Sequence, residues 1–211
     1  MHANALATSR SIHAPAMLTS HSFVRPQLLT YFAAEAEIYA QGEQSGPLYR
    51  IEYGAVRIYR LLGDGRRQVV AFHLAGETFG FEAGRNHSFF AESMVQTGLR
   101  VLDRPTGDQS PDLMALALRG MIRAQEHLLV VGRQNAVERV AAFLLDMMER
   151  QGDLDQVELP MTRIDIGDYL GMTIETVSRN LAKLRKEGII RIPTSRNIEI
   201  VKPAALRRLC A

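Results

Sequence analysis

The chain has 211 residues, a formal net charge of +2, 46% hydrophobic residues and 23% charged residues, which suits one large or two modest globular domains. Its single cysteine, Cys210, excludes an internal disulfide, a zinc finger and an iron–sulfur cluster held by its own thiolates. No run approaches the about 18 apolar residues of a membrane span, and the N-terminus lacks the apolar core of a secretory signal. We therefore expect a cytoplasmic protein with no membrane segment, in which residues 1–22 form a flexible tail.

Residues 23–107 have the pattern of an all-β domain. Short runs rich in Val, Ile, Tyr and Phe alternate with turn residues. The runs are residues 37–41, 48–53, 54–62, 67–74, 77–80 and 89–102. Gly63-Asp64-Gly65 predicts a tight hairpin, because glycine supplies the positive φ that such turns need. Strands at this spacing predict a sandwich, barrel or roll, and the residues ahead of them, 25–36, are predicted to form a short helix.

The apolar period becomes helical in residues 108–134, after a break at residues 103–108. A coiled-coil-type seam repeats by four and three; it consists of Met114, Leu118, Met121, Gln125 and Leu128. Other apolar residues lie around the rest of this helix, and a helix with more than one apolar side needs more than one partner. Packing on the β domain alone is the alternative. We predict that the seam joins two subunits of a homodimer.

Residues 135–211 begin with an amphipathic helix and continue with a helix-turn-helix. Thr162 is the predicted N-cap of one helix, with Asp165 at its third position, and Gly171 ends it. Thr173 caps a second helix that Gly188 closes. A strand, a polar turn and a second strand follow, which predicts a two-stranded wing, and Pro203 starts a final helix.

The second of these helices has residues suited to reading DNA. From residue 175 to the C-terminus nine Lys and Arg stand against three Glu, a net charge of +6. Arg179 can donate two hydrogen bonds to guanine, Glu175 can accept one from cytosine, and Ser178 can contact a base or a phosphate. Glu175 and Arg179 are four apart, so a salt bridge could orient Arg179; an exposed i,i+4 pair with no further role is the alternative.

Other polar and basic side chains around this helix are predicted to contact the DNA backbone, which positions a protein without specifying a sequence. They are Thr162, Arg163, Thr173, Thr176, Lys183 and Arg196.

The segment 174–179, Ile-Glu-Thr-Val-Ser-Arg, together with residues 161–171, closely resembles the DNA-binding core of the CRP/FNR family. Residues 135–145 resemble the helix that links the two halves of such proteins, and residues 76–84 resemble the glycine-rich part of their β-roll. The resemblance spans residues 34–201. It implies an α+β fold with a cyclic-nucleotide-binding-like roll, a long dimer helix and a C-terminal winged helix-turn-helix at residues 135–211.

The motif Glu175-x-x-Ser178-Arg179 resembles the FNR side of the family, whose half-site resembles TTGAT. This implies that the three residues read bases. Ile174 stands where the catabolite activator has an arginine, which implies an apolar contact. The resemblance also implies a homodimeric transcription activator that binds a palindrome in double-stranded DNA and contacts RNA polymerase.

The sequence departs from other members of the CRP/FNR family in two places, and these departures indicate which branch of the family it resembles. Members that bind cyclic AMP place Gly-Glu and Arg-Ser around the phosphate, whereas this chain has Gly80-Phe81 and His87-Ser88. The bidentate clamp is thus lost, and we expect no bound cyclic nucleotide, cofactor or metal. The cysteines of FNR are also missing. The chain therefore resembles FixK-type regulators of microaerobic respiration and nitrogen fixation.

Three alternatives concern control of activity. The roll could bind a small effector, unless Phe79, Phe81, Phe89 and Phe90 fill its interior. A heme-based nitric oxide sensor would need His87 or His73 as an iron ligand. Cys210 would be redox-active if Arg207 and Arg208 lowered its pKa.

Motifs of serine hydrolases, P-loop enzymes and zinc proteases are absent from the sequence, so we predict that the chain is not an enzyme.

Overall fold

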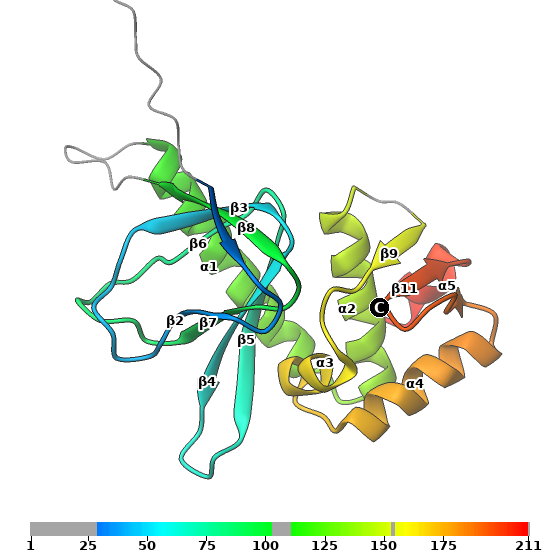
Figure 1. Ribbon diagram of the computed structural model, residues 1–211. Helices are drawn as coiled ribbons and strands as arrows, with labels where there is room; N and C mark the ends of the chain where they lie inside the picture. The colour runs from blue at the N-terminus through cyan, green and yellow to red at the C-terminus, as the bar shows by residue number, and fades with distance from the viewer. Residues whose placement is uncertain (1–28, 103–110, 153–154, 211) are drawn as a thin grey trace, which may run out of the picture.

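The structure is a computed structural model that describes residues 29–102, 111–152 and 155–210. The predicted tail at residues 1–22 and the predicted break at residues 103–108 lie outside these ranges. A β-roll stands beside a mostly helical C-terminal domain, and one long helix passes behind the roll and leads towards that domain (Figure 1).

The roll consists of two four-stranded antiparallel sheets. The first has the order β1 (Leu29–Phe32), β8 (Thr97–Leu102), β3 (Leu48–Tyr53) and β6 (Thr78–Phe79). The second has the order β2 (Glu37–Tyr39), β7 (Phe90–Ser93), β4 (Ala55–Leu61) and β5 (Arg67–Leu74). Apolar side chains between the sheets exclude water; they include Ile51, Val56, Phe79, Ala91 and Leu99.

The structure confirms the predicted hairpin between β4 and β5, in which Leu61 pairs with Arg67 and Gly65 has a φ of +82°. The prediction of a helix over residues 25–36 is wrong for residues 29–36, the part that the structure describes. Residues 29–32 form strand β1, with Leu29 opposite Arg100. Pairing with a strand about 70 residues away outweighs the local helical spacing, because it satisfies the backbone hydrogen bonds of a sheet edge.

Two helices connect the roll to the C-terminal domain. α1 (Pro111–Val131) leaves a row of apolar side chains exposed, whereas α2 (Ala136–Arg150) buries one face that includes Val140, Leu144 and Met147. Neither these nor any other helix in the described ranges is long and apolar enough to cross a membrane.

The C-terminal domain contains the predicted winged helix-turn-helix. Its elements are β9 (Gln156–Glu158), α3 (Arg163–Leu170), α4 (Ile174–Lys186), β10 (Ile190–Arg191), β11 (Asn197–Ile200) and α5 (Pro203–Arg208). The wing has three strands instead of the expected two, because β9 pairs with β11, with Ile198 opposite Val157.

The roll and the C-terminal domain share one apolar core. Phe72 and Leu74 of β5 and Met94 of the roll join the cluster formed by α2, α3 and α4. The ring of Phe72 lies 4.9 Å from that of Tyr169 on α3, measured between centroids. The two parts therefore pack directly against each other.

Candidate DNA interface

Local hydrogen bonds define the first helix of the helix-turn-helix. The Asp165 amide donates to the Thr162 hydroxyl oxygen at 3.2 Å, and the Thr162 amide donates to the Asp165 carboxylate at 2.9 Å. This reciprocal pair is a capping box and satisfies two backbone donors at the start of α3. At its other end Gly171 is left-handed, with a φ of +65°. Both features were predicted, and the structure confirms them.

Gly167 brings the turn against α3. The Met172 amide donates to the Gly167 carbonyl oxygen at 3.0 Å. A Cβ atom on Gly167 would lie 2.6 Å from the carbonyl oxygen of Met172, a distance that two non-bonded atoms cannot adopt. The absence of a side chain thus permits this contact, and α3, the turn and the start of α4 behave as one unit.

The second helix, α4, buries one side and exposes the other. Thr173 caps it, accepting a hydrogen bond from the Thr176 amide at 3.3 Å. Val177, Leu181 and Leu184 are buried in the core. The exposed residues of α4 outside this stripe include Ile174, Glu175, Arg179 and Lys183. An exposed polar and basic face of this kind is what a major groove requires.

Glu175 and Arg179 both face solvent, but no ion pair joins them in the part of the chain that the structure describes. The orienting salt bridge considered from the sequence is therefore not formed. The backbone amide of Glu175 and the Thr173 hydroxyl lower the pKa of the Glu175 carboxyl, and Arg179 adds a smaller effect. Glu175 is thus an ionised hydrogen-bond acceptor at neutral pH.

Ser178 has a partner that the sequence did not suggest. The Arg163 guanidinium donates to its hydroxyl oxygen at 3.3 Å. Arg163 belongs to α3 and was expected only at the DNA backbone. This contact places Arg163 beside the reading face and orients the Ser178 hydroxyl.

The wing supplies further exposed groups. Arg196 is exposed in the turn between β10 and β11, where its amide donates to the Thr194 hydroxyl oxygen at 3.3 Å. Arg191 and Glu199 form an ion pair across the wing at 3.1 Å. Arg196 therefore stays available to a phosphate, whereas the charge of Arg191 is partly compensated.

The pocket of the roll differs from the filled one considered above. A cavity of about 740 Å³ lies between the roll, α1 and α2, and Phe79, Phe81 and Phe89 line it without filling it. Phe90 is not among its lining residues and stacks on Tyr59, with ring centroids 5.1 Å apart.

His87 does not suit an iron ligand. It is buried and stacked on Tyr39 at 3.6 Å between centroids. Its Nε2 accepts from the Gly46 amide at 3.3 Å, and its Nδ1 lies 3.4 Å from Glu82. His73 similarly lies 3.4 Å from Glu77. Within the described ranges no group of His, Cys, Asp and Glu is arranged to hold a metal ion.

Cys210 is half-buried, and its surroundings do not favour the redox role considered as an alternative from the sequence. Burial raises the pKa of its thiol, and the nearby cation is Arg133, not Arg207 or Arg208. The Arg133 guanidinium donates to the Cys210 carbonyl oxygen at 2.7 Å. A raised pKa disfavours the thiolate that oxidation needs.

A roll, a long helix with an exposed apolar row and a winged helix-turn-helix with a polar, basic reading face define a DNA-binding transcription regulator. Comparison with known proteins agrees with this class. The sequence model of the Crp-like helix-turn-helix domain matches residues 138–209, and that of the cyclic nucleotide-binding domain matches residues 29–105.

Among individual proteins, the chain is 54% identical over 211 residues to the nitrogen fixation regulation protein FixK of Rhizobium meliloti (strain 1021), covering 100% of both chains. It is 42% identical over 191 residues to FixK of Azorhizobium caulinodans, covering 84% of this chain and 77% of that protein. The solved structure of FixK2 from Bradyrhizobium japonicum superposes with a TM-score of 0.82 at 40% identity, covering 87% of this chain and 97% of that one. The chain belongs to the CRP/FNR family of transcription regulators, in its FixK branch, and is not an enzyme.

Proposed function

We propose that the chain is a homodimeric transcription activator that reads a palindrome of TTGAT-like half-sites with two α4 helices in successive major grooves. The observation that supports this most directly is the exposed face of α4. Arg179 donates to the guanine of the half-site, Glu175 accepts from the cytosine amino group opposite, and Ser178 contacts a neighbouring base. Ile174 packs against a thymine methyl group.

The DNA backbone is held by groups around this face. Lys183 and Arg196 neutralise phosphates, and the half-buried Arg163 reaches one from beside Ser178. Thr162, Thr173 and Thr176 lie at the N-terminal ends of α3 and α4, where hydroxyls and helix N-terminal amides donate hydrogen bonds to phosphate oxygens. These contacts set the register and leave the sequence reading to α4.

The exposed row on α1 supports the dimer. Met114, Leu118, Met121 and Leu128 are 46–69% exposed, and Gln125 lies on the same seam. Exposing these side chains to water is unfavourable, and a second α1 packed against the seam removes them from it. The two-fold axis of such a pair matches that of a palindrome.

Contacts at Glu82 support activity without cyclic nucleotide. Its side chain is 8% exposed, and its carboxylate accepts from the Ser88 amide and the Ser88 hydroxyl, each at 2.9 Å. In family members that bind cyclic AMP, the positions that correspond to His87 and Ser88 contact the phosphate of the nucleotide. Here the Glu82 carboxylate already accepts the hydrogen bonds that Ser88 can donate. The cavity of about 740 Å³ supports the second candidate, a regulator gated by another small molecule.

The names of the relatives suggest which genes this chain controls. The two FixK proteins are named for nitrogen-fixation regulation, so this chain controls nitrogen-fixation or low-oxygen respiration genes, in the cytoplasm and together with RNA polymerase.

Purified, effector-free protein and a duplex carrying TTGAT-N4-ATCAA test this proposal, with a scrambled duplex as control, at two salt concentrations and with and without reductant. Tight, sequence-dependent binding in every redox condition is expected. Binding that appears only with an added small molecule would favour the gated sensor.

The dimer is tested by sedimentation of Leu118→Glu beside Leu62→Glu, an exposed leucine in the β4–β5 turn. Only the Leu118→Glu protein should sediment as a monomer, whereas the Leu62→Glu protein should remain a dimer. A wild-type monomer at operator-binding concentrations would contradict the dimer.

A further inference from the structure

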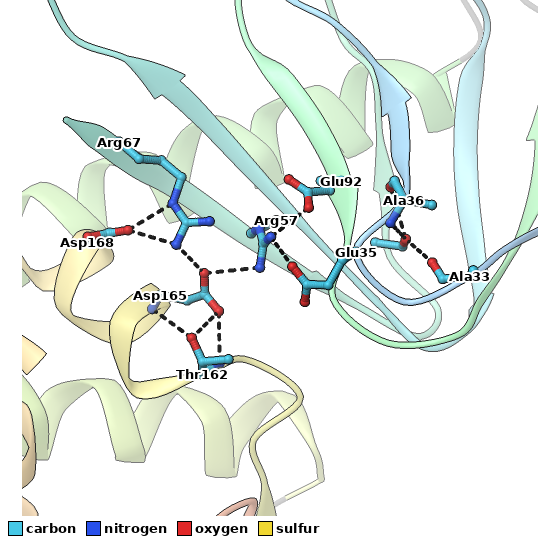
Figure 2. Close-up of polar contacts among 10 residues, drawn as sticks. Ala33, Glu35, Ala36, Arg57, Arg67, Glu92, Thr162, Asp165 and Asp168 are labelled. Atoms are coloured by element: carbon cyan, nitrogen blue, oxygen red, sulfur yellow. Dashed lines mark hydrogen bonds and ion pairs between the residues drawn. The ribbon is translucent and has the colours of Figure 1, made fainter. Parts of the chain in front are cut away.

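Two arginines of the β4–β5 hairpin bind two aspartates of α3 across the boundary between the roll and the C-terminal domain (Figure 2). Arg57 Nη1 lies 3.1 Å from Asp165 Oδ1, and Arg67 Nη2 lies 2.6 Å from the same oxygen. Arg67 also holds Asp168 Oδ2 with Nε at 2.9 Å and Nη2 at 2.8 Å. We call these four residues the interdomain ion pairs.

The roll fixes the position of Arg57. Its side chain is 5% exposed and also binds Glu92 of β7, at 2.7 Å, and Glu35. Glu35 lies in the turn between β1 and β2 with a φ of +61°, which a non-glycine residue adopts at a cost. Three strands or turns of the roll therefore hold Arg57 where it meets Asp165.

Asp165 is held in place on the C-terminal side as well. Asp165 is buried and forms the capping box of α3 with Thr162. The contact at Gly167 joins α3 to the turn and to α4. Any rotation of α3 against the roll thus rotates the reading face of α4 by the same angle.

The neighbouring apolar contact constrains this rotation less. Phe72 and Tyr169 pack at a tilted angle of 44°, and such contacts tolerate small rotations because they are not directional. Charge-assisted hydrogen bonds from a planar guanidinium to carboxylates require a defined geometry. The ion pairs therefore select one orientation from those that the apolar contact allows.

We propose that Arg57 and Arg67 are positioning residues for DNA recognition, which hold α4 in its operator-binding orientation through Asp165 and Asp168 without any bound effector. This inference rests on the proposed operator-binding function. It assigns to the roll of this chain a direct mechanical role, in which fixed ion pairs set the orientation of the reading helix.

The pair Arg67–Asp168 allows a charge-swap test, because Asp168 is outside the capping box. The variants are Arg67→Glu, Asp168→Arg and the double variant that carries both. Arg66→Glu is the matched control: it makes the same charge change one residue away, and Arg66 pairs only with the exposed Asp64 of the hairpin turn among the described residues. Operator binding is measured by fluorescence anisotropy, and the arrangement of the domains in the full-length protein is measured by small-angle X-ray scattering without DNA.

Each single variant should weaken operator binding about tenfold, or about 1.4 kcal/mol, and enlarge the maximum dimension in scattering. The melting temperature of Asp168→Arg should stay near that of the control, whereas that of Arg67→Glu should fall, because its carboxylate faces the buried Asp165. The double variant should bind the operator more tightly than either single variant and come closer to the wild-type scattering profile, because the 67–168 pair is restored, but it should stay below wild type, because a carboxylate at position 67 still faces Asp165, which Arg67 contacts at 2.6 Å. Single variants that match Arg66→Glu in both measurements would overturn the proposal, and so would a double variant no better than the singles. If the wild type failed to bind the operator, the proposed function would fail, whereas the scattering result would still decide whether the ion pairs hold the domains.

Discussion

Replacing Gly167 by alanine tests whether α3 and α4 form one unit. The added Cβ would lie 2.6 Å from the Met172 carbonyl oxygen and 3.6 Å from the Ile174 amide nitrogen. Both are backbone atoms, so rotation of a side chain cannot relieve the collision. Overpacking of this kind costs about 3 kcal/mol, and alanine in a helix returns about 1 kcal/mol relative to glycine. The net loss is about 2 kcal/mol, or about 4–8 °C in melting temperature for a chain of this size.

Thermal unfolding followed by circular dichroism, together with operator binding by anisotropy, measures this effect. Gly63→Ala is the control, because a Cβ there meets nothing within 4 Å, and it should change stability by less than about 1 kcal/mol. Gly167→Ala should also weaken operator binding, since the turn must move before α4 can be placed. If Gly167→Ala retained the wild-type melting temperature and affinity, the close approach would not exist and the argument for a rigid unit would be wrong.

Three further predictions concern single side chains. Thr162→Ala should cost about 1 kcal/mol in urea unfolding, because the capping box is lost; Thr162→Ser, which keeps the hydroxyl, should cost much less. Burial lowers the pKa of His127, which stacks on Tyr169, to about 4. Between pH 6.5 and pH 4 this histidine is therefore protonated in the unfolded chain but not in the folded one, so the free energy of unfolding should fall as the pH falls through this range. In His127→Phe the free energy of unfolding should differ between pH 7 and pH 5 by about 1–2 kcal/mol less than in wild type; equal pH dependence in both proteins would contradict this. Cys210→Ser should bind the operator like wild type with and without peroxide in an anisotropy assay, because the thiol pKa is raised.

The local features of the DNA interface were predictable from the sequence. Thr162, Asp165 and Gly171 act within one helix and its two ends, and caps depend on residues three or four apart. The hairpin turn at Gly65 is local for the same reason. Periodicity also separated the buried Val177 from the exposed Arg179.

Features that depend on distant residues could not be predicted in the same way. Residues 29–32 form a strand because β8 lies beside them, and the β-propensity of Thr, Tyr and Phe in so short a run does not identify that partner. Arg67 and Asp168 are 101 positions apart, and an ion pair leaves no periodic pattern at that distance. The sequence indicated Asp165 as a capping residue only, and its contacts with two arginines of the roll follow from domain packing.

The same limit applies to the pocket between the roll and the helices. Four phenylalanines suggested a filled pocket, but their side-chain directions decide the outcome, and Phe90 turns to stack on Tyr59. The partner of Glu82 depends equally on how the loop folds back on itself.

The central claim is that the exposed face of α4 reads bases, and a cycle that combines Arg179→Ala with replacement of the half-site guanine tests it most directly. Lys183→Ala is the control, since a lost phosphate contact should weaken binding to all duplexes alike. We predict that Arg179→Ala and the base change each cost about 1–3 kcal/mol per half-site and that the two together cost little more than one alone. Fully additive losses, with unchanged discrimination by the Arg179→Ala protein, would contradict the account.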